Sequence, residues 1–344
     1  MSRLFAQMRF TAPLLLGILG LGMTLSLGAG PVTIAPGKVL TLFLDGLGWG
    51  EGGFAGEMET IIIQDIRLPR VLLAALVGAA LAQSGAVMQG FFQNPMADPY
   101  IIGVSAGAAL GATLAVYLSL DFWFLGISGI GVCAFVGALI VTGLVYAISM
   151  RGGRLPVTMV LLTGVALGSL ASAVTSFLMI SSERDLHQIM FWLMGSLSSR
   201  RWEHVQMIWP QVAIGIVLLQ FFARDLNLIL QGEENAQHLG VDVERVKRLL
   251  LVGAALLAAA AVAVSGIIGF VGLIVPHVMR MLVGPDHRRL FPASVLGGAI
   301  LLVGADLLAR TLIAPAEIPI GIITSLLGGP FFLYLLSRRR ETFL

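Results

Sequence analysis

The segment from Arg224 to Arg248 is the part of this sequence best equipped to bind a partner. It reads RDLNLILQGEENAQHLGVDVERVKR, and long apolar runs precede and follow it. Its apolar residues recur at near-helical spacing, as in a helix that lies with one face against another surface. These residues are Leu226, Leu230, Ala236, Leu239 and Val243. The pattern predicts a charged loop with amphipathic helical character and a binding partner.

The residue types that enzymes use for covalent chemistry form no recognisable active site in this chain. It has no GxxxxGK[ST] phosphate-binding loop, and its two lysines, Lys38 and Lys247, are not in a Gly-rich strand-to-helix turn. HExxH is absent, the five histidines are scattered, and Cys133 is alone. The pattern GxSxG occurs once, as GVSAG at 103–107, but it lies within a long apolar run. We therefore expect no catalytic residues, no metal site, no cofactor bound by this chain and no nucleotide hydrolysis by it.

The composition is that of a membrane protein. Of 344 residues, 57% are hydrophobic and 12% charged, and the mean hydropathy is +0.94. About ten runs are near the ~20 residues that a helix needs to cross a bilayer. These runs are 12–30, 71–91, 100–120, 122–149, 155–180, 205–222, 249–267, 268–284, 291–309 and 319–336. Continuous apolar runs favour helices over barrel strands, so we predict an all-α polytopic membrane protein with about ten transmembrane helices.

The basic residues indicate how the chain is oriented. With the N-terminus in the cytoplasm, fourteen of the 21 Lys and Arg residues fall inside, as the positive-inside rule favours. Both termini and the loop 224–248 are then cytoplasmic, and 31–66 is a periplasmic loop within one transmembrane domain, 1–344. The N-terminal apolar run resembles a secretory signal but is nearer span length, which favours an uncleaved span. The basic residues lie at membrane boundaries, and we expect membrane lipid but no nucleic acid as a partner.

Charge is nearly absent from the middle of the predicted spans. A carrier driven by protons or sodium would be expected to bury several ionisable residues there. Asp306 and Arg310, one helical turn apart near the outer end of a span, are spaced to pair with each other. The energy for any transport is therefore expected to come from another subunit, and an ion- or proton-coupled secondary transporter remains the alternative.

Six local motifs together resemble the FecCD family, the permeases of ATP-binding-cassette (ABC) importers for iron-siderophore, haem and cobalamin compounds. They cover roughly residues 60–340, in order. The motifs are RLPR at 67–70, SGAVMQGFFQNPMADPYIIGVSAGA at 84–108, FWLMGSL at 191–197, GEENAQHLGV at 232–241, SGIIGFVGLIVPHVMRM at 265–281 and AEIPIG at 316–321. The resemblance implies the fold of a type II ABC importer permease in the inner membrane. It also implies a homodimer, two cytoplasmic ABC ATPase subunits that bind ATP and Mg, and a periplasmic or lipid-anchored substrate-binding protein.

The resemblance also assigns residues. It places the loop between the sixth and seventh spans in a cleft of the ATPase, with Gly232, Glu233, Glu234, Ala236, Leu239 and Gly240 as coupling residues. It matches Arg67, Arg70 and Arg310 to arginines that receive acidic residues of the binding protein. Without the family, Arg67 and Arg70 would be interfacial anchors at a helix start, and the charged loop would be merely solvated.

The resemblance suggests a translocation path along the dimer axis, lined by the fifth span and by the tenth with the turn before it. The path residues on the fifth span are Thr163, Ser169, Ser172, Thr175 and Ser176. Hydrogen bonds between helices would use the same hydroxyl groups equally well. The function that we predict is ATP-driven import of a metal chelate, either a ferric siderophore or haem, with cobalamin next. Besides the secondary carrier, the alternative is a membrane scaffold that does not transport.

Overall fold

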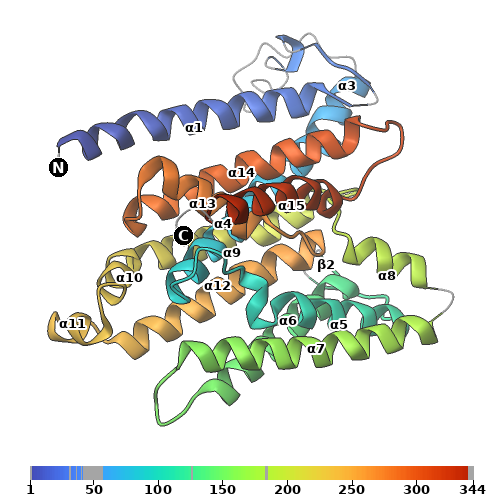
Figure 1. Ribbon diagram of the computed structural model, residues 1–344. Coiled ribbons are helices and arrows are strands. Elements are labelled where there is room, and N and C mark those ends of the chain that lie inside the picture. Colours follow the sequence, from blue (N-terminus) through green and yellow to red (C-terminus); the bar gives the residue numbers. More distant parts are fainter. Residues whose placement is uncertain are drawn as a thin grey trace.

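The computed structural model describes residues 2–30, 32–35, 37–39, 41, 57–124, 127–182 and 185–339. Half of the predicted periplasmic loop 31–66, including 42–56, lies outside the described residues. The long helices of the described residues are α1 (Ser2–Gly28), α4 (Leu68–Phe91), α6 (Gly129–Ser149), α7 (Val157–Ser181), α9 (Trp202–Phe221), α12 (Val243–Ser265), α14 (His287–Thr311) and α15 (Ile320–Arg339). They run roughly side by side in one bundle (Figure 1).

Shorter elements join or extend the long helices. They are α3 (Glu57–Ile61), a π-helix (Ile62–Arg67), a 3₁₀-helix (Pro99–Ile102), α5 (Val104–Tyr117), α8 (Leu186–Leu193), α10 (Ala223–Ile229), α11 (Glu233–His238) and α13 (Val271–Val283). Strands β1 (Trp123–Phe124) and β2 (Ile127–Ser128) pair antiparallel between α5 and α6, with Trp123 opposite Ser128. The helical fold class is therefore confirmed.

Seven of the described helical segments are long and apolar enough to cross a membrane. They are Thr11–Gly28, Met58–Phe91, Gly129–Ser149, Val157–Ser181, Trp202–Phe221, Val243–Ser265 and His287–Thr311. Three shorter apolar helices, Val104–Tyr117, Val271–Val283 and Ile320–Leu335, coincide with the other predicted spans. The count of ten crossings therefore stays a prediction.

Two of the short helices have a local cause in the backbone. Pro99 lacks the N–H that a continuous helix would need, and Gly103 has a φ of +85°, so α5 starts only at Val104. Gly266 has a φ of +70° and Phe270 one of +68°, which ends α12 and delays α13 to Val271. A helix of 14 residues spans about 21 Å, less than the ~30 Å of a bilayer core.

The centre of the bundle is α4, which is buried along 83% of its most apolar stretch. It packs against α14, α12, α13 and α9. Two of these contacts bring backbones together at glycines. A Cβ atom on Gly78 would lie 2.1 Å from the carbonyl oxygen of Gly298, and one on Gly85 would lie 1.9 Å from that of Gly272. Side chains at these positions would force the helices apart.

The outer helices are enclosed much less. In their most apolar stretches, α1 is buried over 17% and α7 over 22%. Exposed apolar side chains on α7 include Leu162, Leu170, Phe177 and Ile180. In a chain of this composition such faces meet lipid or another copy of the protein.

The contact between α4 and α14 is tested by two alanine substitutions on the same helix. We expect Gly298→Ala to destabilise the chain by at least ~1–3 kcal/mol, because the new methyl group meets the carbonyl of Gly78. Gly304→Ala is the control, since nothing lies within 4 Å of its Cβ position. Thermal unfolding of the purified variants in detergent measures the difference. Equal midpoints would mean that the two backbones do not touch.

Candidate functional site

The loop between α9 and α12 folds into two short helices, α10 and α11. Gly232, with a φ of +124°, turns the chain between them, and Gly240, with a φ of +86°, ends the second. Ala236 is fully buried, whereas Leu239 is 67% exposed. Figure 1 shows α10 and α11 at the end of the bundle where the N-terminus also lies. The loop therefore presents Leu239 to its surroundings from a short, anchored helix.

An ion pair joins α11 to the start of α12, and a hydrogen bond ties α12 to the turn before α7. The Nζ atom of Lys247 lies 2.5 Å from Glu233 Oε1 and 3.9 Å from Glu244 Oε1. The other oxygen of Glu244, Oε2, accepts a hydrogen bond from the backbone N–H of Leu155 at 2.8 Å. Of the two predicted coupling acids, Glu233 is thus engaged with the protein's own lysine, and Glu234 is exposed.

Hydrogen bonds also join α10 to the start of α14, and the sequence did not predict them. Asn227 Nδ2 donates to Asp286 Oδ1 at 2.7 Å, and Asn227 Oδ1 accepts from His287 N at 3.0 Å and lies 2.8 Å from His287 Nδ1. Hydrogen bonds from the Arg288 side chain and from Asn227 hold the pKa of Asp286 at about 2. Asp286 also caps α14 by accepting from Arg288 N. The sequence signal that could have located this contact is the GPDHRR segment at 284–289, whose Gly, Pro and Asp are turn residues.

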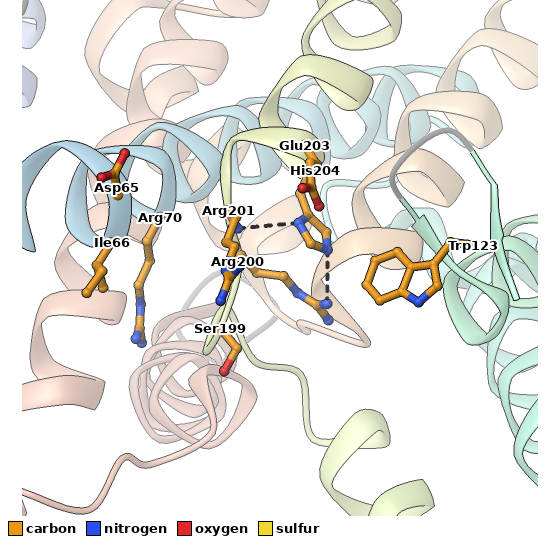
Figure 2. Close-up of a pocket in the computed structure, with 9 residues that line it drawn as sticks. All are labelled: Asp65, Ile66, Arg70, Trp123, Ser199, Arg200, Arg201, Glu203 and His204. Atoms are coloured by element: carbon orange, nitrogen blue, oxygen red, sulfur yellow. Dashed lines mark hydrogen bonds between the residues drawn. The ribbon is translucent and has the colours of Figure 1, made fainter. Parts of the chain in front are cut away.

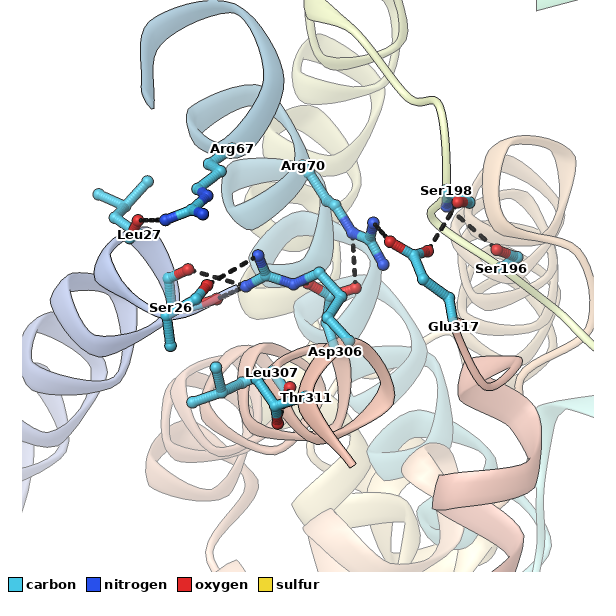
Figure 3. Close-up of polar contacts among 12 residues, drawn as sticks. Ser26, Leu27, Arg67, Arg70, Ser196, Ser198, Asp306, Leu307, Thr311 and Glu317 are labelled. Carbon is cyan, nitrogen blue, oxygen red and sulfur yellow. Dashed lines mark hydrogen bonds and ion pairs between the residues drawn. The ribbon is translucent and has the colours of Figure 1, made fainter. Parts of the chain in front are cut away.

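At the opposite end of the bundle, the three predicted docking arginines are almost fully buried. Arg67 is 5%, Arg70 7% and Arg310 5% exposed. Arg70 donates to Asp306 at 2.9 Å and to Glu317 at 2.8 Å. Arg310 donates to the carbonyl oxygen of Ser26 at 2.8 Å (Figure 3). The three side chains therefore already have partners within the chain, and their contact with a binding protein stays a prediction.

Asp306 is the centre of this network, and it is fully buried. Its Oδ1 accepts from Arg70, and its Oδ2 lies 3.1 Å from Arg310 Nε as an ion pair that lacks hydrogen-bond geometry. The pairing of Asp306 with Arg310, expected from their spacing, is thus confirmed. The larger finding is Arg70, which is 236 positions away from Asp306 in the sequence.

Arg67 and Glu317 complete the network at its two sides. Arg67 donates to the carbonyl oxygens of Leu27 at 2.6 Å and Gly28 at 3.1 Å, and also to that of Val32. Glu317 accepts from Arg70 and from the Ser198 hydroxyl at 2.7 Å. Partial burial alone would raise the pKa of Glu317, but these hydrogen bonds hold it below its usual range. The network therefore ties together the ends of α1, α4 and α14 that lie away from α10 and α11.

The five predicted path residues on α7 do not share one environment. Thr163 and Thr175 are buried, whereas Ser169, Ser172 and Ser176 are exposed. Thr175 Oγ1 donates to the carbonyl oxygen of Ala171, and Ser176 Oγ to that of Ser172, both at 2.9 Å. These two hydroxyl groups are therefore bonded within their own helix and do not bridge helices.

An apolar pocket of about 500 Å³ lies beside the start of α15. Its lining residues are Leu193, Met194, Ile267, Gly269, Gly321, Ile322, Ser325 and Leu326. They come from the end of α8, the break before α13, and α15. No three His, Cys, Asp or Glu residues within the described ranges group as a metal site would require.

Comparison with known proteins identifies relatives along almost the whole chain. Residues 18–338 match the FecCD transport family. The cobalamin import system permease protein BtuC of Halobacterium salinarum is 52% identical over 82% of this chain and 75% of its own length. The hemin transport system permease protein HmuU of Yersinia pestis is 48% identical over 80% of this chain and 83% of its own length.

A third relative and one solved structure extend the match. The Fe(3+)-citrate import system permease protein YfmD of Bacillus subtilis is 37% identical over 97% of this chain and 96% of its own length. A solved structure, described as an inward-facing conformation of a protein assigned as a metal-chelate type ABC transporter, superposes with a TM-score of 0.82. It is 34% identical, and the match covers 98% of this chain and 99% of that one.

The buried network predicts different effects for its two acids. We expect Asp306→Asn to destabilise the protein by ~3–5 kcal/mol, because it leaves two buried arginines without their shared counter-charge. Glu317→Gln serves as the matched control: its side chain is 36% exposed, and the loss should be about 1 kcal/mol or less. Thermal unfolding in detergent compares them, and equal losses would show that Asp306 is not the centre of the network.

Proposed function

This chain belongs to the FecCD transport family, and we propose that it carries a metal chelate across the membrane as the permease subunit of an ATP-driven importer. The observation that carries the proposal is the match over residues 18–338, together with relatives whose names specify cobalamin, hemin and Fe(3+)-citrate import. Those three compounds are all metal chelates. A ferric siderophore or haem is our first candidate for the substrate, and cobalamin is next.

An importer permease of this family works with an ATPase and a substrate-binding protein. We propose two cytoplasmic ATPase subunits, which bind ATP and Mg, and a periplasmic or lipid-anchored binding protein. The permease is a multi-pass membrane protein, and we place it in the inner membrane with both termini in the cytoplasm. The N-terminus lies at the same end of the bundle as α10 and α11 (Figure 1), as this orientation requires.

A homodimer fits the open faces of α7 and α15. Leu162, Phe177 and Ile180 on α7 and Leu326 and Leu333 on α15 are exposed. We propose that two copies meet through these helices and that the path runs between them. Ser169, Ser172 and Ser176 then offer mild polar groups to a passing chelate, which suits release rather than tight binding. Thr163 and Thr175 are buried and support the helix from behind.

We propose that the binding protein docks at the outer end, around Arg67, Arg70 and Arg310. In the structure these arginines fix α1, α4 and α14 relative to one another through buried bonds. For direct contact, they would have to exchange internal acceptors for acidic residues of the binding protein. Such an exchange could couple docking to a shift of the three helices.

We propose that α10 and α11 transmit the motion of the ATPase to the spans. Leu239 and Glu234 are exposed, whereas Ala236 and the Glu233–Lys247 pair anchor α11 to the bundle. Gly232 and Gly240 set the turns at its two ends. A pocket of about 350 Å³, lined in part by Leu239, Gly240 and Arg245, lies beside this helix. A short helix that is anchored in this way can transmit movement of the ATPase to the spans as rigid-body motion.

The energy source is tested by reconstitution. We expect uptake into proteoliposomes only when the permease, its ATPase, the binding protein and ATP are all present. Mass spectrometry of the ligand retained by the purified complex identifies the chelate. Uptake by the permease without an ATPase, driven by an ion gradient, would contradict the proposal and favour a secondary carrier.

The coupling role is tested at the two exposed residues of the loop. We expect the double variant Glu234→Ala, Leu239→Ala to lower ATP-dependent uptake about tenfold or more, a loss equivalent to ~1.4 kcal/mol or more. The ATPase should fail to copurify, or should hydrolyse ATP without uptake. Arg151→Ala, an exposed change in the turn between α6 and α7, is the control. Fully coupled uptake by the double variant would remove these residues from the interface.

A further inference from the structure

Arg200, which is partly buried, differs from the three buried arginines at the outer end, because no carboxylate among the described residues neutralises it. It lies between α8 and α9, and no acid within the described ranges comes within 4.0 Å of its guanidinium group. Its Nε atom is buried without a hydrogen-bond partner. Burial accordingly lowers the pKa of Arg200. A partly buried cation whose Nε donor is buried and unused is costly, and a ligand that accepts a hydrogen bond from it removes much of that cost.

Among the residues that the structure describes, the guanidinium group has one polar partner, His204, and the contact is weak. Arg200 Nη1 lies 3.3 Å from His204 Nε2, while the backbone N–H of Arg201 points at His204 Nδ1, also at 3.3 Å. A neutral imidazole has only one acceptor nitrogen, and an imidazolium has none. His204 can therefore satisfy one of the two donors at most.

Arg200 lines a pocket that opens at the outer end of the bundle. The pocket has a volume of about 550 Å³, and its walls come from the π-helix Ile62–Arg67 and the start of α4, from β1, and from residues 199–201 with the start of α9. Figure 2 shows the Arg200 side chain extending toward His204 and Trp123, with Asp65 on the far side of Arg70. Trp123, on β1, is 68% exposed. The pocket thus combines an exposed aromatic ring with an unsatisfied guanidinium group.

We infer that this pocket receives an acidic side chain of the substrate-binding protein, with Arg200 binding the carboxylate and Trp123 packing against the apolar surface around it. The inference rests on the proposed function, which requires such a partner at this end. An arginine side chain can bind a carboxylate through two parallel hydrogen bonds, and tryptophan and arginine are both enriched among the residues that dominate protein interfaces. Arg200 is thus a docking cation additional to Arg67, Arg70 and Arg310.

The other charges in the pocket determine what kind of contact this is. Asp65 and Glu203 also line it, and both are exposed. With Arg200 and Arg201 they leave the pocket close to neutral, since Arg70 is already paired with Asp306 and Glu317. Recognition should therefore depend on a carboxylate that reaches Arg200, and less on long-range attraction.

The test measures the affinity of the binding protein for the assembled transporter in nanodiscs. We expect Trp123→Ala and Arg200→Gln each to weaken binding about tenfold or more, while ATPase assembly is unchanged. Trp209→Ala is the matched aromatic control, because that ring is 53% exposed on α9 outside the pocket. Arg151→Gln is the control for charge. Single acidic residues of the binding protein are then substituted in turn. For one of them, the substitution should weaken binding to the wild-type transporter but should not weaken binding to the Arg200→Gln transporter any further.

Each outcome decides between supporting and overturning the inference. Wild-type affinity in folded Trp123→Ala and Arg200→Gln complexes would overturn it, and so would a loss of stability that depends on anionic lipid without a loss of affinity, which would identify a lipid site. If Arg200→Gln does not fold, Arg200→Lys and Trp123→Ala are measured instead, because lysine keeps the positive charge but lacks the two parallel N–H donors of the guanidinium group. Weaker binding by both variants would support the inference, and wild-type affinity would overturn it. If the wild-type complex binds no substrate-binding protein at all, the proposed function itself is refuted.

Discussion

The close approach of backbones around α4 is the constraint on which the rest of the structure depends. Gly78 meets Gly298 on α14, and Gly85 meets Gly272 on α13, at distances that leave no room for a Cβ atom. In lipid, helices gain little from burying apolar surface against one another, so contact area and fit must hold them together. The glycines supply both, and they fix α4, α13 and α14 as one unit.

The two candidate sites lie at opposite ends of this same helix. At its N-terminal end, Arg70 of α4 joins Asp306 of α14 and Glu317. At its C-terminal end, a Cβ atom on Gly90 would lie 2.7 Å from Leu226 of α10 and 2.9 Å from His287 of α14. The residues that contact α10 and those of the arginine network are therefore parts of one packed body.

Hydropathy and local motifs predicted the helical class, the positions of most spans and the charged loop, because each of these features depends on neighbours in the sequence. The short α5 and α13 were harder to predict, since Gly103 and Gly266 determine where the helices break through φ angles that apolar runs do not reveal. The burial of Arg70 could not be read from the sequence, because a basic residue at a span end has the same local pattern whether it faces water or Asp306. Its partners lie 236 and 247 positions away.

The rigidity of the α4 unit limits how a push on α10 can travel under the proposed function. Asn227 ties α10 to Asp286 and His287 at the start of α14, so a displaced α10 carries α14 with it. Because α14 and α4 cannot slide past each other at Gly78 and Gly298, both must then move as one body. The helices with open faces, α7 and α15, have fewer contacts to break. In the proposed homodimer, opening of the path would separate these helices from their counterparts in the second copy and leave the α4 unit intact.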